Sequence, residues 1–179
     1  DNYYIYWVLL RWTGCRKNEP LHLQWKHIDF DAVGGIGMID MPSPKTSKKS
    51  KKSRKLPMFV DSPLRAMLLA EYERQGKPNG EMYVVRGVCN LKAHDRTKTN
   101  WDTVNPNTNL KRLVERAGVE PWKKTCQNVR VTRENELLLS GQYRPEAVHY
   151  FIGHTRKTYE SSYASMTEAD FAPRNAQEQ

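Results

Sequence analysis

Two arginines in separate motifs could bind the same phosphate group. The first motif reads TGCRKNE over residues 13–19, with Arg16 three positions before Glu19. The second places Arg130 three positions after Gln127, on one face of an expected helix. Guanidinium groups that converge on a phosphate would stabilise the charge that develops during phosphoryl transfer. Either arginine alone is more often a surface side chain, so this chemistry requires the two motifs to meet.

The neighbours of Arg16 predict an anion site. One helix is expected to end at Gly14 and a second to run over 15–25, which places Arg16 at a helix N-terminus. Backbone N–H groups at that position would join the guanidinium in binding an anion. Glu19, one turn further on, would hold the guanidinium in place. A plain helix junction with a surface Arg–Glu pair is the alternative.

A histidine and a tyrosine near the C-terminus could supply proton transfer and a nucleophile. Gly153 and His154 are followed by Tyr163 nine residues later, and the glycine would let the backbone turn so that His154 points inward. A lone histidine or tyrosine is usually structural, and Tyr163 is one of nine tyrosines. The pair therefore gains weight only in combination with the arginines.

Residues 45–55 form an intensely basic segment, KTSKKSKKSRK, without a single acidic side chain. The chain has a formal net charge of +9, and outside this segment its basic and acidic residues nearly balance. Cations at this density repel one another unless an anion neutralises them, and phosphate contacts release counterions. The segment predicts a nucleic-acid contact, with a solvated loop or a nuclear-targeting-like patch as alternatives. The predicted DNA-binding residues are Lys48, Lys49, Lys51, Lys52, Arg54 and Lys55.

The order of these motifs resembles the tyrosine recombinase (phage integrase) family. The pattern is T-G-x-R-x-x-E, Lys-Thr on a β-hairpin, x-x-x-R, and G-H with a tyrosine nine residues later, and it extends from Trp12 to Phe171. The resemblance implies the C-terminal catalytic domain of such an enzyme. It also implies site residues with the following roles: Arg16 and Arg130 as the two catalytic arginines, Lys45 as the hairpin lysine, His154 as the G-H histidine, Tyr163 as the nucleophile and Glu19 as the acid behind the first arginine.

The mechanism that the resemblance implies is DNA strand transfer through a phosphotyrosine. Tyr163 would attack a phosphodiester, forming a 3′-phosphotyrosyl link while a 5′-hydroxyl leaves with a proton from Lys45. His154 would donate to a phosphate oxygen or assist the tyrosine. Gln127 stands where the family usually has His or Lys and cannot carry a proton at neutral pH. This residue favours one alternative, a recombinase-like domain that only binds DNA. The other alternative is a type IB topoisomerase-like enzyme, which shares the chemistry but relaxes DNA without partner exchange.

The partners that the resemblance implies are double-stranded DNA and further copies of the chain, in a tetrameric synapse. No cofactor or metal is expected, since His22 and His27 have no cysteine near them to complete a site. The three cysteines include no CxxC pair, which favours a reducing compartment such as a bacterial-type cytosol or nucleoid. The longest apolar run, over 3–10, is too short to span a membrane.

The pattern of apolar residues and turn residues predicts a single α+β domain over 1–179, mostly helical with a small antiparallel sheet. The chain has no initiator Met, and we expect it to be part of a longer protein. The resemblance to tyrosine recombinases implies an N-terminal DNA-clamping domain that lies outside this chain. Helices are expected over 3–12, 15–25, 63–75, 107–117, 125–140, 144–151, 158–163 and 167–172. Strand-like pieces are expected over 27–31, 38–42, 55–60 and 81–85, with the basic segment between the second and third.

Overall fold

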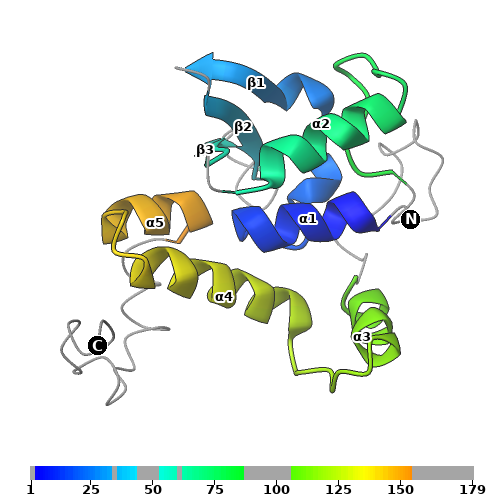
Figure 1. Cartoon of the computed structure of the whole chain (residues 1–179), viewed down its shortest axis with the longest axis vertical. Helices are drawn as coiled ribbons and strands as arrows, with labels where there is room; N and C mark the ends of the chain where they lie inside the picture. The colour runs from blue at the N-terminus through cyan, green and yellow to red at the C-terminus, as the bar shows by residue number, and fades with distance from the viewer. Residues whose placement is uncertain (1–2, 34–35, 44–52, 60–61, 87–105, 155–179) are drawn as a thin grey trace.

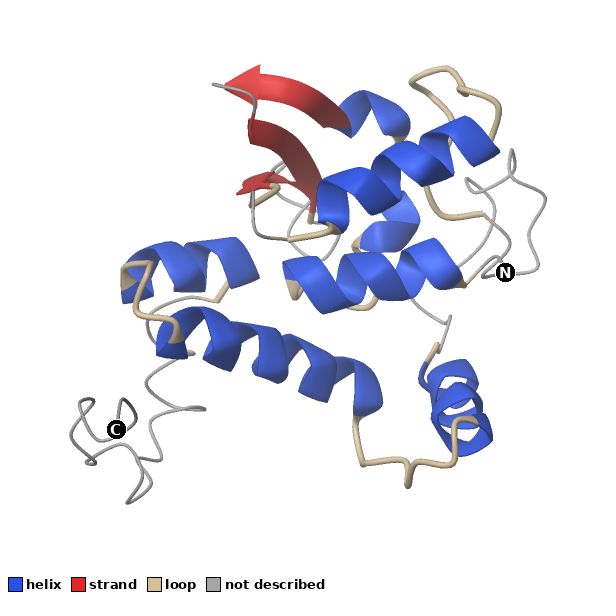
Figure 2. Cartoon of the chain, in the orientation of Figure 1, coloured by secondary structure: helices blue, strands red, loops and turns tan. Residues whose placement is uncertain are grey.

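The computed structural model describes residues 3–33, 36–43, 53–59, 62–86 and 106–154 (Figure 1). These residues form five α-helices and one three-stranded sheet, which confirms the predicted α+β class (Figure 2). The helices are α1 (Tyr4–Thr13), α2 (Leu64–Arg74), α3 (Asn107–Arg116), α4 (Thr125–Leu139) and α5 (Pro145–Ile152). The strands are β1 (Ile28–Val33), β2 (Ile36–Pro42) and β3 (Ser53–Pro57), and two 3-10 helices, η1 (Pro20–His22) and η2 (Trp25–His27), precede them.

The sheet has the order β1-β2-β3 with both pairs antiparallel. Ile39 in the central strand lies opposite Ile28 of β1 and Leu56 of β3. Burial alternates along β3, so that Arg54 and Leu56 are buried while Lys55 is exposed, as the two-residue period of a strand requires. Since β2 and β3 are paired neighbours, residues 44–52 connect the two strands of a hairpin, as the sequence predicts for the basic segment.

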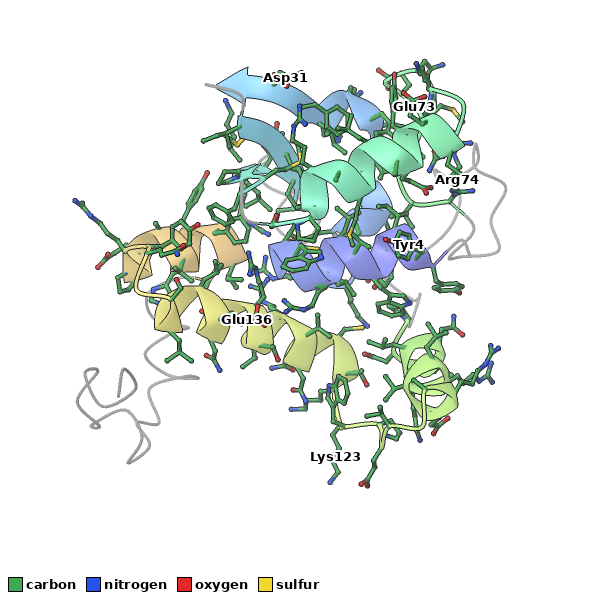
Figure 3. The ribbon with its side chains drawn as sticks, viewed as in Figure 1. Tyr4, Asp31, Glu73, Arg74, Lys123 and Glu136 are labelled. Atoms are coloured by element: carbon green, nitrogen blue, oxygen red, sulfur yellow. The ribbon has the colours of Figure 1, made fainter. Side chains whose placement is uncertain are left out.

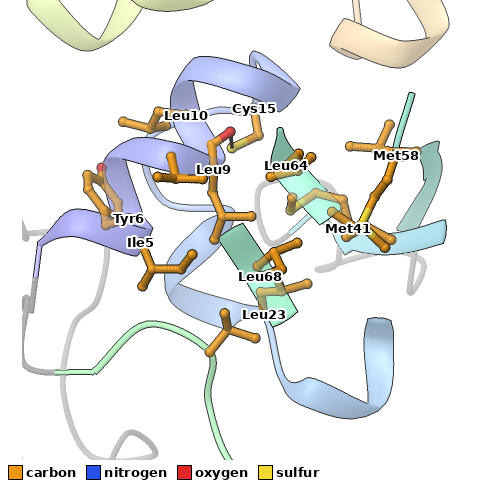
Figure 4. Close-up of a cluster of buried hydrophobic side chains, with 14 of the residues drawn as sticks. Ile5, Tyr6, Leu9, Leu10, Cys15, Leu23, Met41, Met58, Leu64 and Leu68 are labelled. Carbon is orange, nitrogen blue, oxygen red and sulfur yellow. Dashed lines mark hydrogen bonds between the residues drawn. The ribbon is translucent and has the colours of Figure 1, made fainter. Parts of the chain in front are cut away.

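Helix α1 lies between α2 and α4 and packs against both (Figure 1). Its sequence, YIYWVLLRWT, is apolar on most faces, which suits a helix with neighbours on two sides. Figure 4 shows Leu9 of α1 in one cluster with Leu64 and Leu68 of α2 and Met41 of β2, all essentially inaccessible to solvent. Burial of apolar side chains on this scale is the main stabilising contribution of a core, at about 25 cal/mol per Å². This core holds the end of α1, and with it the first motif, in a fixed position.

The remaining helices assemble around α4. Helix α5 packs against α4 and β3, and α3 packs against α4 near its other end (Figure 1). In the part of the chain that the structure describes, no helix combines the length and the apolar character needed to cross a membrane.

The helix predicted over 15–25 is wrong. Residues 17–19 form a turn, and Pro20 then begins the 3-10 helix η1. Further on, Trp25 N–H donates to the Met82 carbonyl and Val84 N–H donates to the Leu23 carbonyl. These backbone groups bond to a distant segment and not along a helix, and apolar periodicity cannot reveal that choice. The extended piece predicted over 81–85 is accordingly a single bridge between Gln24 and Tyr83.

The other described elements agree with the predictions within a few residues. The helices predicted over 3–12, 63–75, 107–117, 125–140 and 144–151 correspond to α1 to α5. The third strand begins two residues earlier than predicted and ends at Pro57, because its pairing with β2 runs from Ser53 to Pro57. The helices predicted over 158–163 and 167–172 lie outside the described residues.

Candidate active site

The first motif forms a tight turn at the C-terminus of α1. Gly14 adopts a left-handed conformation, with φ of 59°, and its N–H donates to the Leu10 carbonyl. The hydroxyl of Thr13 donates to the Leu9 carbonyl at 2.6 Å and accepts from the N–H of Cys15 at 3.2 Å. A side chain at position 14 would lie 2.5 Å from Ile152 Cδ1, so both the turn and the contact with α5 require glycine.

Arg16 therefore follows a helix C-terminus, and the prediction that it lies at a helix N-terminus is wrong. Its backbone N–H donates to Glu19 Oε2 at 2.8 Å and so is already engaged within the protein. Its guanidinium pairs with Glu19 Oε1 at 3.0 Å, which confirms the predicted ion pair. The side chain of Arg16 is 39% exposed, so part of the guanidinium faces solvent.

Glu19 is shared between two arginines. Besides Arg16, it accepts from both terminal nitrogens of Arg54, at 2.9 and 2.8 Å, in a bidentate pair. Burial raises the pKa of Glu19, but hydrogen bonds and positive charge from Arg54 and Arg16 outweigh it and hold the pKa below its ordinary value. Glu19 is 1% exposed and ionised, and it anchors the base of the site.

Arg54 is one of the predicted DNA contacts, and its position is unlike that of a surface cation. It is 8% exposed, and its guanidinium is held by Glu19. Lys55, the next residue, points to the opposite face of the strand and is exposed. Of these two adjacent basic residues, only Lys55 presents its charge to solvent, and contact of either with DNA stays a prediction.

Arg130 joins the first motif to the G-H motif. Its Nη1 donates to the Gly14 carbonyl at 2.6 Å, and its Nε donates to His154 Nε2 at 3.2 Å. Arg16 reaches the same place, since its Nη2 donates to the Gly153 carbonyl at 2.7 Å. The structure thus brings Arg16, Glu19, Arg130 and His154 together from three motifs.

The charge of Arg130 is held at an energetic cost. Burial and the positive charge of Arg16 lower its pKa to about 10, with Arg54 adding to the effect and Glu19 opposing it. The guanidinium is still protonated at neutral pH. Its Nη2 is buried and has no hydrogen-bond partner among the described residues. A crowded cation with an unused donor is a site that favours an anion.

Further contacts fix α4 against the end of α1. Arg133 donates from Nε to the Trp12 carbonyl at 3.1 Å and lies over the Trp12 ring. Glu136, labelled in Figure 3 on the side of α4 toward α1, accepts two hydrogen bonds from Arg11, at 2.8 and 2.6 Å. Arg133 places a cation near the carbonyls at the C-terminus of α1, which is stabilising. Because these contacts fix α4 against α1, they also hold Arg130, which lies on α4, in position.

Sequence reasoning missed Glu134. Its Oε1 lies 3.0 Å from His154 Nδ1, and the residue is 1% exposed. A signal was available, because Glu134 is four residues after Arg130 and so lies on the same helix face. A charged residue on the buried face of a helix is uncommon without a specific partner.

The other predicted site residues are divided between the surface and the undescribed segments. Gln127 is exposed on α4, one turn before Arg130. The predicted nucleophile Tyr163 and the five lysines of the 45–52 stretch lie outside the described residues. Those lysines are Lys45, Lys48, Lys49, Lys51 and Lys52. Among the residues that are described, no group of His, Cys, Asp and Glu could hold a metal ion.

Comparison with solved structures shows that the chain has the fold of Xer tyrosine recombinases. A XerA recombinase matches 94% of the chain with a TM-score of 0.64 and 16% identity. XerH site-specific recombinase matches 86% of the chain, with a TM-score of 0.56 and 17% identity in a pre-cleavage complex with its difH substrate. In a post-cleavage complex with a palindromic difH substrate, the TM-score is 0.52 and the identity 20%.

The likeness concerns the fold, and it covers only part of each of the longer solved proteins. The chain spans 54% of the XerA structure's length and 39% of that of XerH. No protein-family model matches the sequence, and no curated protein matches it. The predicted resemblance to tyrosine recombinases is thus confirmed for the fold, while the roles of individual residues stay predictions.

Proposed function

We propose that the chain is the catalytic domain of a site-specific DNA recombinase that cleaves and rejoins strands through a 3′-phosphotyrosyl intermediate. The observation that carries the proposal is the meeting of Arg16 and Arg130, which come from motifs more than a hundred residues apart. Arg130 has an unused buried donor, and Arg16 is partly exposed, so the two can share one phosphate. The fold supports the same conclusion.

In the proposed reaction, the bond between Tyr163 Oη and phosphorus forms as the bond from phosphorus to the 5′-oxygen breaks. Arg16 and Arg130 stabilise the non-bridging oxygens, whose negative charge increases in the transition state. The 5′-oxygen takes a proton from Lys45, and the tyrosine gives its own proton to His154 Nε2. The energy of the broken bond is kept in the phosphotyrosine, so a 5′-hydroxyl from a second strand can reverse the step without ATP.

A DNA-binding domain without catalytic activity is the second candidate. Gln127 favours it, because an amide replaces a residue that carries a proton in the resembling family. The intact set of Arg16, Glu19, Arg130 and His154 favours the enzyme.

Covalent trapping separates the two candidates. The DNA probe is a pool of nicked duplexes with randomised sequence around the nick, so that the target site need not be known. Cleavage near the nick releases a short 5′-hydroxyl strand and leaves the protein attached, and the adduct is recovered on an SDS gel. The enzyme should form an adduct whose DNA, once sequenced, shows a common site.

The matched control is Tyr163→Phe, which removes only the hydroxyl. It should bind the recovered site as well as the wild type and form no adduct. An adduct formed by the Phe variant would show that another residue is the nucleophile. DNA binding by the wild type without any adduct would favour the second candidate.

A further inference from the structure

His154 is held at both ring nitrogens by groups on one helix. Its Nδ1 lies 3.0 Å from Glu134 Oε1, and its Nε2 lies 3.2 Å from Arg130 Nε. Glu134 and Arg130 are one turn apart on α4, and both are buried. The His154 side chain, at the end of α5, is 7% exposed. The ring is thus fixed in orientation by two contacts of different chemistry.

The chemistry of these two contacts determines where the ring proton lies. A guanidinium nitrogen can only donate, so His154 Nε2 must be the acceptor in its contact with Arg130. The single proton of the neutral ring is then on Nδ1, which donates to the Glu134 carboxylate. Glu134 consequently stabilises one of the two tautomers of His154.

Among the described residues, the side chain of Glu134 has a hydrogen-bond contact with His154 alone. Its second oxygen, Oε2, is buried and has no hydrogen-bond partner among the described residues. Buried polar atoms are normally satisfied, and a carboxylate that serves only stability would be expected to use both oxygens. The hydrogen bonding that the described residues offer Glu134 is directed at His154. Burial of a carboxylate for this one contact indicates a functional requirement.

We propose that Glu134 is a positioning residue, which fixes His154 as the Nδ1–H tautomer and, through His154, holds Arg130 in the site. The proposal rests on the proposed recombinase function and deepens it. The chain of contacts runs from Glu134 through His154 to Arg130 and the Gly14 carbonyl. A carboxylate behind Nδ1 also stabilises the imidazolium that forms when Nε2 takes a proton. The pair would thus supply the proton-carrying function that Gln127 lacks.

The tautomer can be measured without DNA. A long-range proton–nitrogen correlation spectrum of the full chain, with His154 assigned from a His154→Gln variant, should show Nδ1 protonated and Nε2 bare. Glu134→Leu removes the acceptor at Nδ1, which frees the ring to turn away from Arg130 Nε, and should therefore give a mixture of tautomers. Glu134→Gln keeps a carbonyl acceptor and should retain the Nδ1–H form. Glu115→Gln, on α3 and paired with Lys111 at the surface, is the matched control and should leave the His154 signals unchanged.

The second readout is the rate of covalent adduct formation on the recovered DNA site. Glu134→Leu should slow this rate by about 10- to 100-fold, as is typical when a partner behind a functional histidine is removed. Affinity for the same duplex should be unchanged, since Glu134 does not face solvent. Glu134→Gln should recover part of the rate, because it preserves the tautomer but not the charge.

The outcomes separate this proposal from the proposed function. Wild-type His154 protonated at Nε2, or a Leu variant with the wild-type tautomer, would overturn the role of Glu134 whether or not the protein cleaves DNA. Absence of any adduct, with the expected tautomers, would overturn the recombinase function and leave the positioning role intact. If the Leu variant does not fold, the wild-type spectrum alone still decides the tautomer.

Discussion

The guanidinium of Arg16 donates to the main-chain carbonyl of Gly153 at 2.7 Å, across 137 positions of sequence. This bond joins the turn after α1 to the turn after α5, where Gly153 has a φ of 84°. It directs one side of the Arg16 guanidinium into the protein while Glu19 holds another. The backbone around His154 is therefore part of the structure that orients Arg16.

Gly153→Ala should destabilise the protein, because the added Cβ would collide with the side chain of Arg54. A Cβ at this position would lie 2.6 Å from Arg54 Nη1, and Arg54 cannot move away without leaving Glu19. Left-handed backbone adds a further cost for any residue with a side chain. The expected loss of unfolding free energy is about 4 kcal/mol, with about 3 from disruption of the buried ion pair and about 1 from the backbone, measured by urea unfolding.

Gly118→Ala is the matched control for that substitution. Gly118 also has a positive φ, of 73°, but open space surrounds the added Cβ. The Gly118→Ala variant should lose only about 1 kcal/mol of unfolding free energy, from backbone strain. Equal losses in the two variants would show that Arg54 does not fill the space beside position 153.

Glu19→Gln should also be strongly destabilising, in a pH-dependent way. It leaves the 8%-exposed Arg54 without its anionic partner, at a cost of about 3–5 kcal/mol near neutral pH. The folded pKa of Glu19 is lower than the ordinary 4.5, so its contribution is complete above pH 4.5 and is lost as the pH falls from 4.5 through the folded pKa.

Unfolding in urea at a series of pH values would test this dependence. The difference in unfolding free energy between the wild type and Glu19→Gln should become smaller below pH 4.5. Glu81→Gln, which breaks the exposed pair with Lys26, is the comparison and should change stability by less than about 0.5 kcal/mol at all pH values. A constant gap across the acid range would contradict the assignment of the ionised carboxylate to Glu19.

Small anions should stabilise the fold through Arg130. Its buried charge is crowded by Arg16, and an anion at its unused Nη2 would relieve that repulsion. At ten times its dissociation constant, a bound phosphate contributes about 1.4 kcal/mol, which corresponds to roughly 3–6 °C in melting temperature. Arg130→Gln should lose this increment in a thermal melt with and without inorganic phosphate.

Phosphate also strengthens folding in general, so a second variant is needed. Arg74→Gln removes an exposed arginine far from the site, paired with Glu71, and should keep the full increment. An identical phosphate response in Arg130→Gln and Arg74→Gln would place the anion elsewhere.

The lysines between β2 and β3 should account for a large part of the salt dependence of DNA binding. Replacing Lys48, Lys49, Lys51 and Lys52 by Ala should lower the slope of log affinity against log salt by about 0.9 for each DNA phosphate that the variant no longer neutralises. Binding to a random-sequence duplex should weaken by a similar factor for every sequence. We expect little change in stability, because lysines that contact DNA must lie at the surface, where charges contribute little.

Two other lysines provide the reference for this titration. Lys26 and Lys77 are exposed, and Glu81 and Glu73 already neutralise their charges. Their replacement by Ala should leave the slope unchanged. A slope that is unaffected by the four hairpin substitutions would show that the basic segment does not face DNA.

Much of the architecture could be predicted because it follows from local patterns. Apolar periodicity, and glycines just after the last helical residues, locate α1 and α4. The order of the motifs, compared with the resembling family, predicts that Arg16 and Arg130 lie close together, as they do. The failure at 15–25 has a non-local cause, since the N–H of Trp25 bonds to the Met82 carbonyl, 57 positions away. No pattern within the segment carries that information.

The positions of buried charged residues also could not be predicted from sequence patterns. Arg54 stands in a basic run that is typical of a surface, and only the strand register shows that it points inward while Lys55 points outward. Glu134 stands among other charged residues of α4, and its role depends on His154, which arrives from a different helix. Sequence spacing predicts the neighbours along a helix but not those across a packing interface.

The pairing of Arg130 with the Gly14 carbonyl has a consequence for the order of folding. The three strands follow one another along the chain and can pair as soon as they are made, whereas this bond closes a loop of 116 positions. The entropy lost on closing a loop increases with its length, so the strands should pair first and the arginines meet last. A chain still emerging from the ribosome would hold Arg16 without Arg130, so the phosphate site that we propose would be assembled only after residue 130 has been made.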